Sequence, residues 1–412
     1  MNVWLLKDGE NLPVQAGARR MRTWLLAEEL ARRGHRVTWW SSTHSHQRKS
    51  LVFDADREVD VAPGFRLKLL HAGAYRRNVS LARLAHHARL AAKFRRAAPR
   101  EPRPDAIVAA FPTIELAHAA VTHARARRVP AIVDIRDPWP DAILDRLPQA
   151  LRPPGRLALL PMQARARACM RGSSSLVAVS QGFLDWGLGK AGMARRPSDR
   201  VFYLGNPGRE AGATRSPRIA QLANRIEGKI VACFVGSFGH VYELGLVCDA
   251  AREMAHRRTE RVHFVIAGDG EQAARVAAAA RDLPNVDAPG WLSADEADDL
   301  MRMSHVGLAP IRQNPGCVPN KISEYAAAGL PILSSLEGET ADLLARHSAG
   351  LTYAPGDRAG FLQMLERLAG QEELRRELSG NAHAMFEREF QASHVYGEYA
   401  RHVESVVRSA AG

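Results

Sequence analysis

The residues whose types and spacing most clearly suggest chemistry lie between Pro319 and Pro331. Lys321 supplies a cation, and Glu324 supplies a carboxylate one helical turn later. Pro319 and Asn320 predict the start of a helix, whose first-turn amides favour anionic oxygens. A cation for phosphate and a carboxylate for sugar hydroxyls predict a nucleotide-sugar site. The alternative is a solvated Lys and Glu on an ordinary helix start.

The predicted neighbouring elements would hold this stretch still. Apolar residues from Ile322 to Ala326 recur at helical spacing, and Gly329 followed by Pro331 ends the helix after about two turns. Residues 332–335 then predict a short buried strand. The predicted site is therefore a short helix between a loop and a strand.

Length and composition indicate the broad class. A chain of 412 residues exceeds what one core usually supports and predicts two domains. We expect no transmembrane helix, because no stretch approaches about 18 uninterrupted apolar residues, and the N-terminal residues resemble a strand rather than a signal peptide. The four cysteines lack metal-ligand or CxxC spacing, which predicts structural thiols in a reduced, cytoplasmic protein.

Charge is unevenly distributed along the chain. Residues 1–200 hold 35 Lys and Arg against 17 Asp and Glu, a balance of +18, whereas the remainder carries −5. A basic half attracts phosphates, anionic lipid headgroups or nucleic acid. Nucleic acid is disfavoured, because interleaved aromatic residues and a recognisable binding motif are missing. The alternative is an Arg-rich composition that serves only solubility.

The first half predicts an open parallel sheet. Strand 2–6, a loop containing Gly17, a helix and strand 37–40 form a βαβ unit, although the loop does not match G-x-G-x-x-G. Arg19, Arg20 and Arg22 follow that loop, where they would bind an anionic group or remain solvated.

Two later features of the first half are site candidates. Residues 76–100 predict a basic helix with an apolar stripe, which would lie on an anionic membrane or pack on the sheet. Its stripe consists of Leu81, Leu84, Leu90 and Phe94, with His86 and His87 beside it. Arg136 and Asp137 follow strand 131–136 and would face a cleft, or form a structural pair.

A second α/β series follows a Gly- and Pro-bearing stretch. Strand 230–235 ends in the glycine loop 236–239, and strand 263–267 ends in the turn 268–270. Residues 358–409 read as helical. Two such series predict two doubly wound domains with a cleft between them.

These residues resemble retaining family 4 glycosyltransferases, which have the GT-B fold. The resemblance covers nearly the whole chain, and its strongest part is the run 319–331, which is similar to the family's P-[NS]-K-x-x-E-Y-x-A-x-G-x-P donor motif. Residues 134–140 (DIRDPWP) resemble a subgroup that builds bacterial surface polysaccharides of the colanic-acid and O-antigen type.

The resemblance implies two Rossmann-like domains facing a cleft, with C-terminal helices crossing back. It implies an N-terminal acceptor domain over 1–205, a linker over 206–228, a donor domain over 229–385 and a returning helix over 386–412. The donor would be a UDP-linked nucleotide-diphosphate sugar that gives a hexosyl or N-acetylhexosaminyl group to a lipid-linked or glycan acceptor. The enzyme would be peripheral on the inner membrane and would need no metal or other cofactor.

Family roles are carried over residue by residue. Glu324 would bind the donor ribose, and Lys321 and Asp137 are the other catalytic candidates. The further donor-binding candidates are Gly236, Ser237, Gly239, His240, Gly268, Gly290, Trp291, Leu292, Pro319 and Asn320. The acceptor-binding candidates are Gly17, Arg20, Arg136 and Asp137.

The chain departs from the family pattern at two places. Gly316 stands where many members have a second Glu, and Ser237 and Tyr242 stand near the positions of a frequent Arg and Lys. Backbone amides from Gly316 to Asn320 would then contact the sugar. The alternatives to a glycosyltransferase are a nucleotide-sugar epimerase on the same fold and a nucleic-acid-binding protein.

Overall fold

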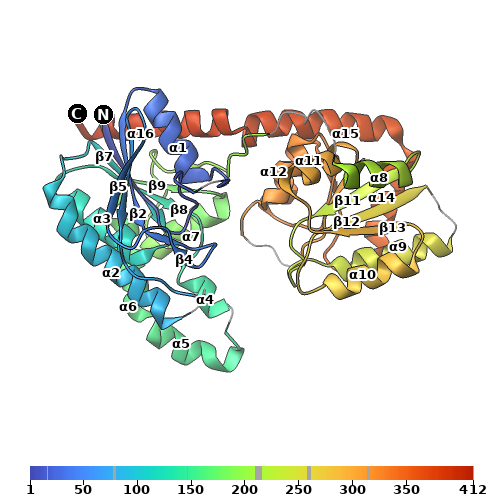
Figure 1. The fold of residues 1–412 in the computed structure, drawn as a ribbon, viewed down its shortest axis with the longest axis horizontal. Helices are drawn as coiled ribbons and strands as arrows, with labels where there is room; N and C mark the ends of the chain where they lie inside the picture. The colour runs from blue at the N-terminus through green and yellow to red at the C-terminus, as the bar shows by residue number, and fades with distance from the viewer. Residues whose placement is uncertain are drawn as a thin grey trace. The chain divides into compact units, whose positions relative to one another are not determined.

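The computed structural model describes residues 1–15, 17–77, 80–145, 147–208, 216–257, 261–312 and 316–411. The chain forms two compact α/β units, one comprising Met1–Gly205 with Val395–Gly412 and the other Asn206–His394. Each unit is built on a largely parallel sheet with helices against it (Figure 1). No helix in the described ranges is long and apolar enough to cross a membrane.

The N-terminal unit contains a sheet of order β10-β9-β8-β7-β1-β2-β6-β5 in its described residues, parallel except for β5. Its strands are β1 (Asn2–Leu6), β2 (Arg36–Ser42), β5 (Arg57–Ala62), β6 (Phe65–Leu70), β7 (Ala106–Phe111), β8 (Ala131–Ile135), β9 (Ser175–Ala178) and β10 (Arg200–Val201). A small antiparallel pair consists of β3 (His44–Ser45) and β4 (Ser50–Leu51). The sequence did not predict β5 and β6.

The helices of this unit are α1 (Arg22–Arg32), α2 (Leu81–Ala97), α3 (Ile114–Ala126), α4 (Asp141–Asp145), α5 (Arg152–Ala158), α6 (Leu160–Arg171), α7 (Gln181–Ala191) and most of α16 (Ala392–Ala411). Short 3-10 turns are η1 (Ala98–Arg100) and η2 (Gln149–Leu151). Strands such as β1 and β7 are buried apolar runs, as parallel strands covered on both faces require. The hydroxyl of Ser180 caps α7.

The C-terminal unit has a fully parallel sheet of order β13-β12-β11-β14-β15-β16 in its described residues. Its strands are β11 (Ile230–Val235), β12 (Val262–Ala267), β13 (Val286–Gly290), β14 (Val306–Ala309), β15 (Ile332–Ser334) and β16 (Gly350–Thr352). Its helices are α8 (Pro217–Arg225), α9 (Leu244–His256), α10 (Ala273–Asp282), α11 (Ala294–Arg302), α12 (Asn320–Ala327), α13 (Glu339–His347), α14 (Arg358–Gly370) and α15 (Glu372–Met385), followed by the π-helical turn η3 (Phe386–Phe390).

The final helix belongs mostly to the N-terminal unit. Glu404 accepts hydrogen bonds from Arg33 at 2.7 and 2.8 Å, and the His402 ring lies 3.0 Å from the Ser175 hydroxyl. The two-domain α/β fold with parallel sheets is therefore confirmed, and its C-terminal helix packs on the N-terminal unit.

Two expectations about local structure need correction. The predicted linker contains α8, which Ser216 caps and which buries Ile219 and Leu222; residues 209–215 of that linker lie outside the described residues. The predicted stripe of helix 76–100 is only partly right. Leu90 and Phe94 are buried, but Leu81 is 83% exposed.

His86 and His87 are buried rather than flanking the stripe. The two nitrogens of His86 lie 3.1 Å from Asp8 Oδ2 and 2.7 Å from the Gly73 carbonyl oxygen. These two contacts hold the ring between the loop after β1 and the chain after β6. Burial alone would raise the pKa of Asp8, but His86, His87 and Ser42 hold it below its usual range. This pairing fixes α2 against the sheet.

A buried charge cluster links α1, β8 and the loop after β1. Asp134 accepts from Arg22 at 2.9 and 3.0 Å and from Arg136 at 2.8 Å, and Arg136 also pairs with Glu10. Arg22 further donates to the carbonyls of residues 202 and 203. Burial would raise the pKa of Asp134, but the two guanidinium groups hold it below its usual range.

Arg22→Met should lower the free energy of unfolding of the N-terminal unit by about 3–5 kcal/mol, because it leaves Asp134 buried with part of its charge uncompensated. Urea denaturation at pH 7 measures this. The matched control is Arg20→Ala, whose guanidinium is 53% exposed and pairs with Glu28; it should change stability by about 0–1 kcal/mol. Equal effects of the two substitutions would contradict a structural role for Arg22.

Candidate functional site

The topology of the C-terminal sheet indicates where a ligand would bind. From β11 the chain proceeds outward through β12 and β13, and then returns to β14 on the other side of β11. Loops that follow strands on either side of such a reversal diverge and leave a crevice at the carboxyl ends of the strands. The loops after β11 and β14, together with the helix α12 (Asn320–Ala327) that follows the second loop, carry most of the predicted donor residues.

Lys321 lies in the first turn of α12 and is 6% exposed. Its ammonium donates to the carbonyl of Val235, the last residue of β11. It lies 3.8 Å from the centre of the Phe234 ring and 4.9 Å from that of Tyr242. Burial lowers the pKa of Lys321 to about 8, although nearby Glu324 and Cys233 act in the opposite direction. α12 therefore places a cation directly against the glycine loop.

Three predicted glycines meet at this edge of the sheet. Gly236 has a φ of +136°, and its amide donates to Ala267 at 2.9 Å. The amide of Gly268, with φ +151°, donates to the Gly290 carbonyl at 2.8 Å, and a Cβ there would overlap the Gly236 carbonyl. Only glycine permits this approach of three loops, because every other residue carries a Cβ.

These contacts correct the roles expected for backbone groups. In the glycine loop, where Gly236 is a donor-binding candidate, the amides of Gly236 and Phe238 donate to the carbonyls of Ala267 and Asp269 and are therefore engaged within the protein. Of the donor-binding candidates after β12, the carbonyls of Gly290 and Trp291 accept from Gly268 and Arg218. The Trp291 side chain is 65% exposed, whereas Leu292 is buried.

Glu324 lies one turn after Lys321 on α12 and is half-buried. Its charge acts on both Lys321 and Tyr242, so these three side chains lie near one another. Pro319 precedes the helix and accepts from the Ile322 amide at 3.0 Å, so this first-turn amide is engaged within the helix. Asn320 is exposed as the first helical residue.

The remaining predicted donor residues lie in the loop after β11. Ser237 is exposed, and the Gly239 carbonyl accepts from the side chain of Gln272 at 2.8 Å. His240 was considered as a cation, but its ring pairs with Glu271 at 3.1 Å and is 81% exposed. Lys321 is therefore the buried cation of this edge among the described residues.

Tyr325 and Tyr242 are the residues whose structural roles sequence reasoning missed. The Tyr325 hydroxyl accepts from the Val235 amide at 3.3 Å and donates to the Leu308 carbonyl at 3.0 Å, joining β11 to β14. Tyr242 pairs with Ile311 in an isolated antiparallel bridge across the same two loops. The helical spacing of Tyr325 indicated burial, but not this hydroxyl bridge.

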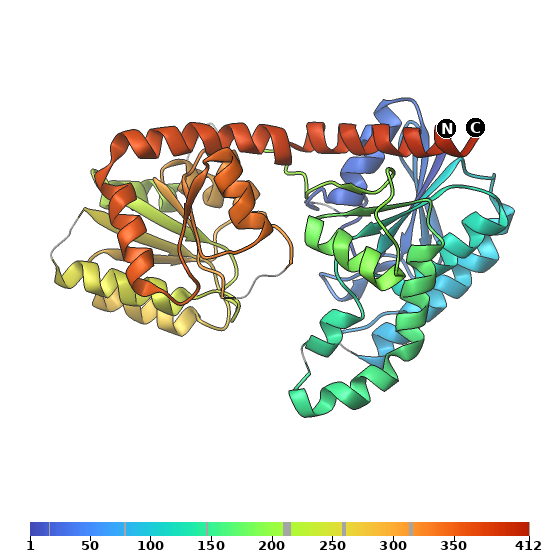
Figure 2. The same ribbon diagram turned by 180° about the vertical axis from the view of Figure 1, so that it is seen from behind.

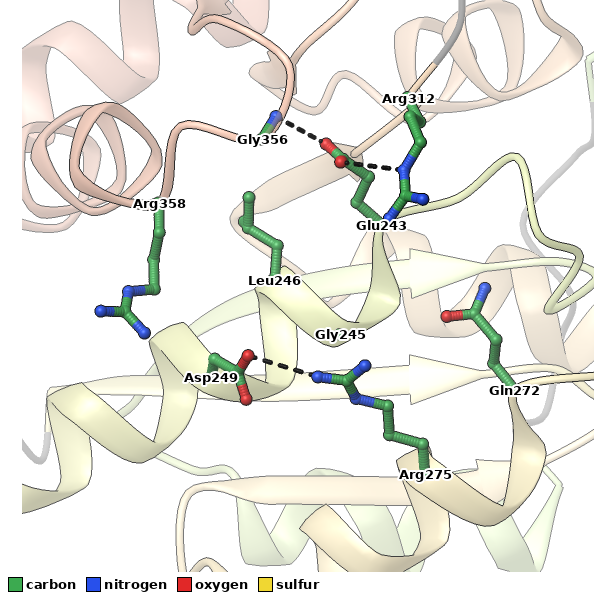
Figure 3. Close-up of a pocket in the computed structure, with 9 residues that line it drawn as sticks. All are labelled: Glu243, Gly245, Leu246, Asp249, Gln272, Arg275, Arg312, Gly356 and Arg358. Carbon is green, nitrogen blue, oxygen red and sulfur yellow. Dashed lines mark hydrogen bonds and ion pairs between the residues drawn. The ribbon is translucent and has the colours of Figure 1, made fainter.

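A pocket of about 520 Å³ lies beside this edge, at the start of α9 (Figure 3). Glu243 accepts from the Gly356 amide at 2.9 Å and from Arg312 at 3.3 Å, and Asp249 accepts from Arg275 at 3.3 Å (Figure 3). The arginines at the pocket are thus held by carboxylates, and none of the predicted donor residues lines it.

The predicted acceptor residues lie in the N-terminal unit. Gly17 is exposed in a turn with φ +67° after β1, and Arg20 is exposed near α1. Asp137 follows β8, and its carboxylate accepts from the Trp139 indole at 3.2 Å. The prediction that Arg136 binds the acceptor needs correction, because all three of its side-chain nitrogens bond to Asp134, Glu10 or Thr23 inside the charge cluster. Its role is structural.

Two family models match the chain. Residues 17–207 match the glycosyl transferase 4-like domain, and residues 229–371 match glycosyl transferases group 1. With two Rossmann-like units, the chain is a glycosyltransferase of the GT-B type.

Solved structures share the fold over nearly the whole length. Anabaena HepE in complex with UDP has a TM-score of 0.66 at 15% identity, covering 98% of this chain and 100% of that chain. Sucrose-phosphate synthase from Thermosynechococcus elongatus has a TM-score of 0.71 at 14% sequence identity, and the match covers 99% of each chain. WaaG, a glycosyltransferase involved in lipopolysaccharide biosynthesis, has a TM-score of 0.62 at 14% sequence identity, and the match covers 98% of this chain and 99% of that chain. A comparison with curated proteins finds no match.

Lys321→Met should stabilise the C-terminal unit at pH 7. A lysine whose pKa is about 8 in the folded state and 10.5 in the unfolded state binds its proton less tightly in the folded protein. Below pH 8 this difference lowers the free energy of unfolding by about 3 kcal/mol. Stability of the wild type then rises as pH increases from 8 to 10.5. The gain from the substitution should therefore be largest at pH 7 and shrink over that range.

Urea midpoints of both proteins at pH 7, 8.5 and 10 measure the effect of Lys321→Met. Lys229→Met, at a half-buried position where β11 begins, is the control and should show no such pH-dependent gain. A variant that is less stable than the wild type at pH 7 would contradict the destabilisation that we assign to the buried charge of Lys321.

Proposed function

We propose that this glycosyltransferase transfers a hexosyl or N-acetylhexosaminyl group from a UDP-sugar to a lipid-linked or glycan acceptor, with retained anomeric configuration. The observation that carries the donor part is the short helix α12, which presents Lys321 and Glu324 beside the glycine loop of β11. This edge combines a buried cation with a carboxylate at the reversal of a parallel sheet, where α/β folds bind ligands.

The solved relatives support UDP as the nucleotide. HepE structures contain UDP, UDP with glucose, and UDP-glucose, and a trehalose-6-phosphate structure from E. coli is bound with UDP-2-fluoro glucose. These proteins share only the fold with this chain, so the base and the sugar are part of the proposal.

Surface-polysaccharide synthesis is the role we propose for the acceptor side. The run 134–140, the basic N-terminal half and the likeness to WaaG, which is involved in lipopolysaccharide biosynthesis, support it. The enzyme would then work in the cytoplasm, at the inner membrane face, where cationic side chains favour anionic headgroups.

The proposed chemistry is mainly electrostatic. Lys321 would stabilise the charge that develops on the departing diphosphate, and its burial strengthens that interaction because the local dielectric is low. Glu324 would accept hydrogen bonds from the ribose hydroxyls. Asp137 would act on the acceptor side, and no metal or other cofactor takes part.

A thermal-shift panel tests the donor assignment. UDP and UDP-sugars should raise the melting temperature, because a ligand that binds the folded state stabilises it, whereas GDP and ADP should not. The shift should persist in EDTA. Loss of the shift in EDTA would contradict metal-independent binding, and a preference for GDP or ADP would contradict the choice of UDP.

Glu324→Ala should lower kcat/KM by about a hundredfold or more, because charged hydrogen bonds of about 1.5–3 kcal/mol each would be lost from a bound ribose. Transfer from UDP-sugar is measured with extracted lipid-linked acceptors and with soluble sugar phosphates, and NMR of the product reports its anomeric configuration. The control is Glu377→Ala, an exposed carboxylate on α15. Full activity of a folded Glu324→Ala protein would refute the donor site.

A further inference from the structure

One part of the N-terminal unit has no hydrophobic core of its own. Between Asp141 and Pro161, the described residues contribute no buried side chain to the protein. This stretch includes α4, η2 and α5, and ends where α6 begins. In Figures 1 and 2, α5 lies at the tip of the unit, away from the strands of the sheet.

Leucines that would normally be buried are exposed at this tip. Leu151, Leu157 and Leu160 are 52%, 70% and 55% exposed, and Leu81 and Leu84 are exposed at the start of α2. These five are most of the large hydrophobic side chains exposed in the described residues; the other two are Val241 and Trp291. Contiguous exposed apolar side chains mark an interaction surface.

The start of α2 lies at the same end of the unit as α4. The guanidinium of Arg83, on the first turn of α2, lies 4.9 Å from the centre of the Trp139 ring, just before α4. α4 is held in turn to α6 by the 2.6 Å hydrogen bond between Gln163 and Asp141. We call the surface formed by Leu81, Leu84, Leu151, Leu157 and Leu160 the leucine tip.

The charge around the leucine tip is predominantly positive, although Asp141 and Asp145 lie on α4. Between Asp145 and Asp185 the sequence has six arginines and no acidic residue. Arg152 and Arg156 are exposed on α5 beside the leucines, and Arg165 and Arg167 are exposed on α6. An exposed apolar surface bordered by cations matches the boundary between acyl chains and anionic headgroups.

We propose that the leucine tip docks on an anionic lipid surface, with its leucines at the acyl boundary and Arg152 and Arg156 on the headgroups. The inference deepens the proposed function and rests on it, because an enzyme that acts on a lipid-linked acceptor must reach a membrane. It also restricts the membrane contact predicted for helix 76–100 to Leu81 and Leu84 at its start, because Leu90 and Phe94 are buried in the protein.

Flotation of the full chain with phosphatidylglycerol–phosphatidylcholine vesicles at low salt tests the proposal. The wild type should bind these vesicles, and should bind pure phosphatidylcholine vesicles much less. Leu157→Ser with Leu160→Ser should weaken binding by about tenfold or more. Arg152→Glu with Arg156→Glu should weaken it by more than about fivefold per arginine, because each substitution reverses a charge.

Two matched controls lie on the other unit. Val241→Ser removes an apolar side chain that is 52% exposed, and Arg388→Glu reverses an exposed charge; both should bind as the wild type does. All substituted side chains are exposed, so unchanged melting temperatures will show that the variants are folded.

Three results would overturn the proposal. The wild type could fail to bind the vesicles, the leucine variant could bind them as well as the wild type does, or the wild type could sediment as a dimer while the leucine variant sediments as a monomer. The last would assign the tip to a second copy of the chain. UDP thermal shifts on the same preparations separate this proposal from the donor assignment. Vesicle binding without a UDP shift refutes only the donor, and a UDP shift without vesicle binding refutes only the tip.

Discussion

The C-terminal unit depends on one hydroxyl that joins two strands at the point where their loops must separate. Tyr325 bonds to Val235 at the end of β11 and to Leu308 of β14. Its ring lies over Gly307, where any Cβ would overlap it. Because Tyr325 belongs to α12, the bridge fixes that helix against the sheet. Lys321 and Glu324 share the helix, so the bridge also sets where they point.

Both units contain charge in places where burial opposes it, but the outcomes differ. In the N-terminal unit, Arg22, Asp134, Arg136 and Glu10 compensate one another through short hydrogen bonds, so the cluster orders the loop after β1 without leaving a charge uncompensated. Among the described residues, no carboxylate bonds to Lys321 in this way, and its ammonium lies against a carbonyl and two aromatic rings. A cation held in this way is poised for an anionic ligand.

The sequence predicted elements whose signals are local. Buried strands such as β7 and β11 are continuous apolar runs. Pro319 before α12 and Gly329 after it indicate both ends of that helix from the local sequence alone. The fold class followed from the order of such elements, whereas the glycosyltransferase assignment came from the resemblance of the run 319–331 to the family's donor motif. The strands β5 and β6 were missed, because charged residues interrupt their apolar pattern.

Other misses arose from partners distant in sequence. His86 appeared to flank a stripe because periodicity cannot show that Asp8, 78 residues away, contacts its ring inside the protein. Arg136 appeared to be an acceptor ligand because its partner Glu10 is 126 residues away. Backbone amides of the glycine loop were assigned to a ligand for the same reason, since the pairing of Gly236 with Ala267 depends on the register of neighbouring strands. Long-range pairing, rather than local propensity, limited the prediction.

In the proposed mechanism, the departures from the family pattern would give Lys321 a larger share of the electrostatic stabilisation. Ser237 and Tyr242 provide no cation, His240 is paired with Glu271, and the amides of Gly236 and Phe238 are engaged. A diphosphate beside Lys321 would favour its charged form and raise its pKa above the value of about 8 in the free protein. Donor and proton would therefore bind together at alkaline pH, and the burial that destabilises Lys321 in the free enzyme would be offset in the complex.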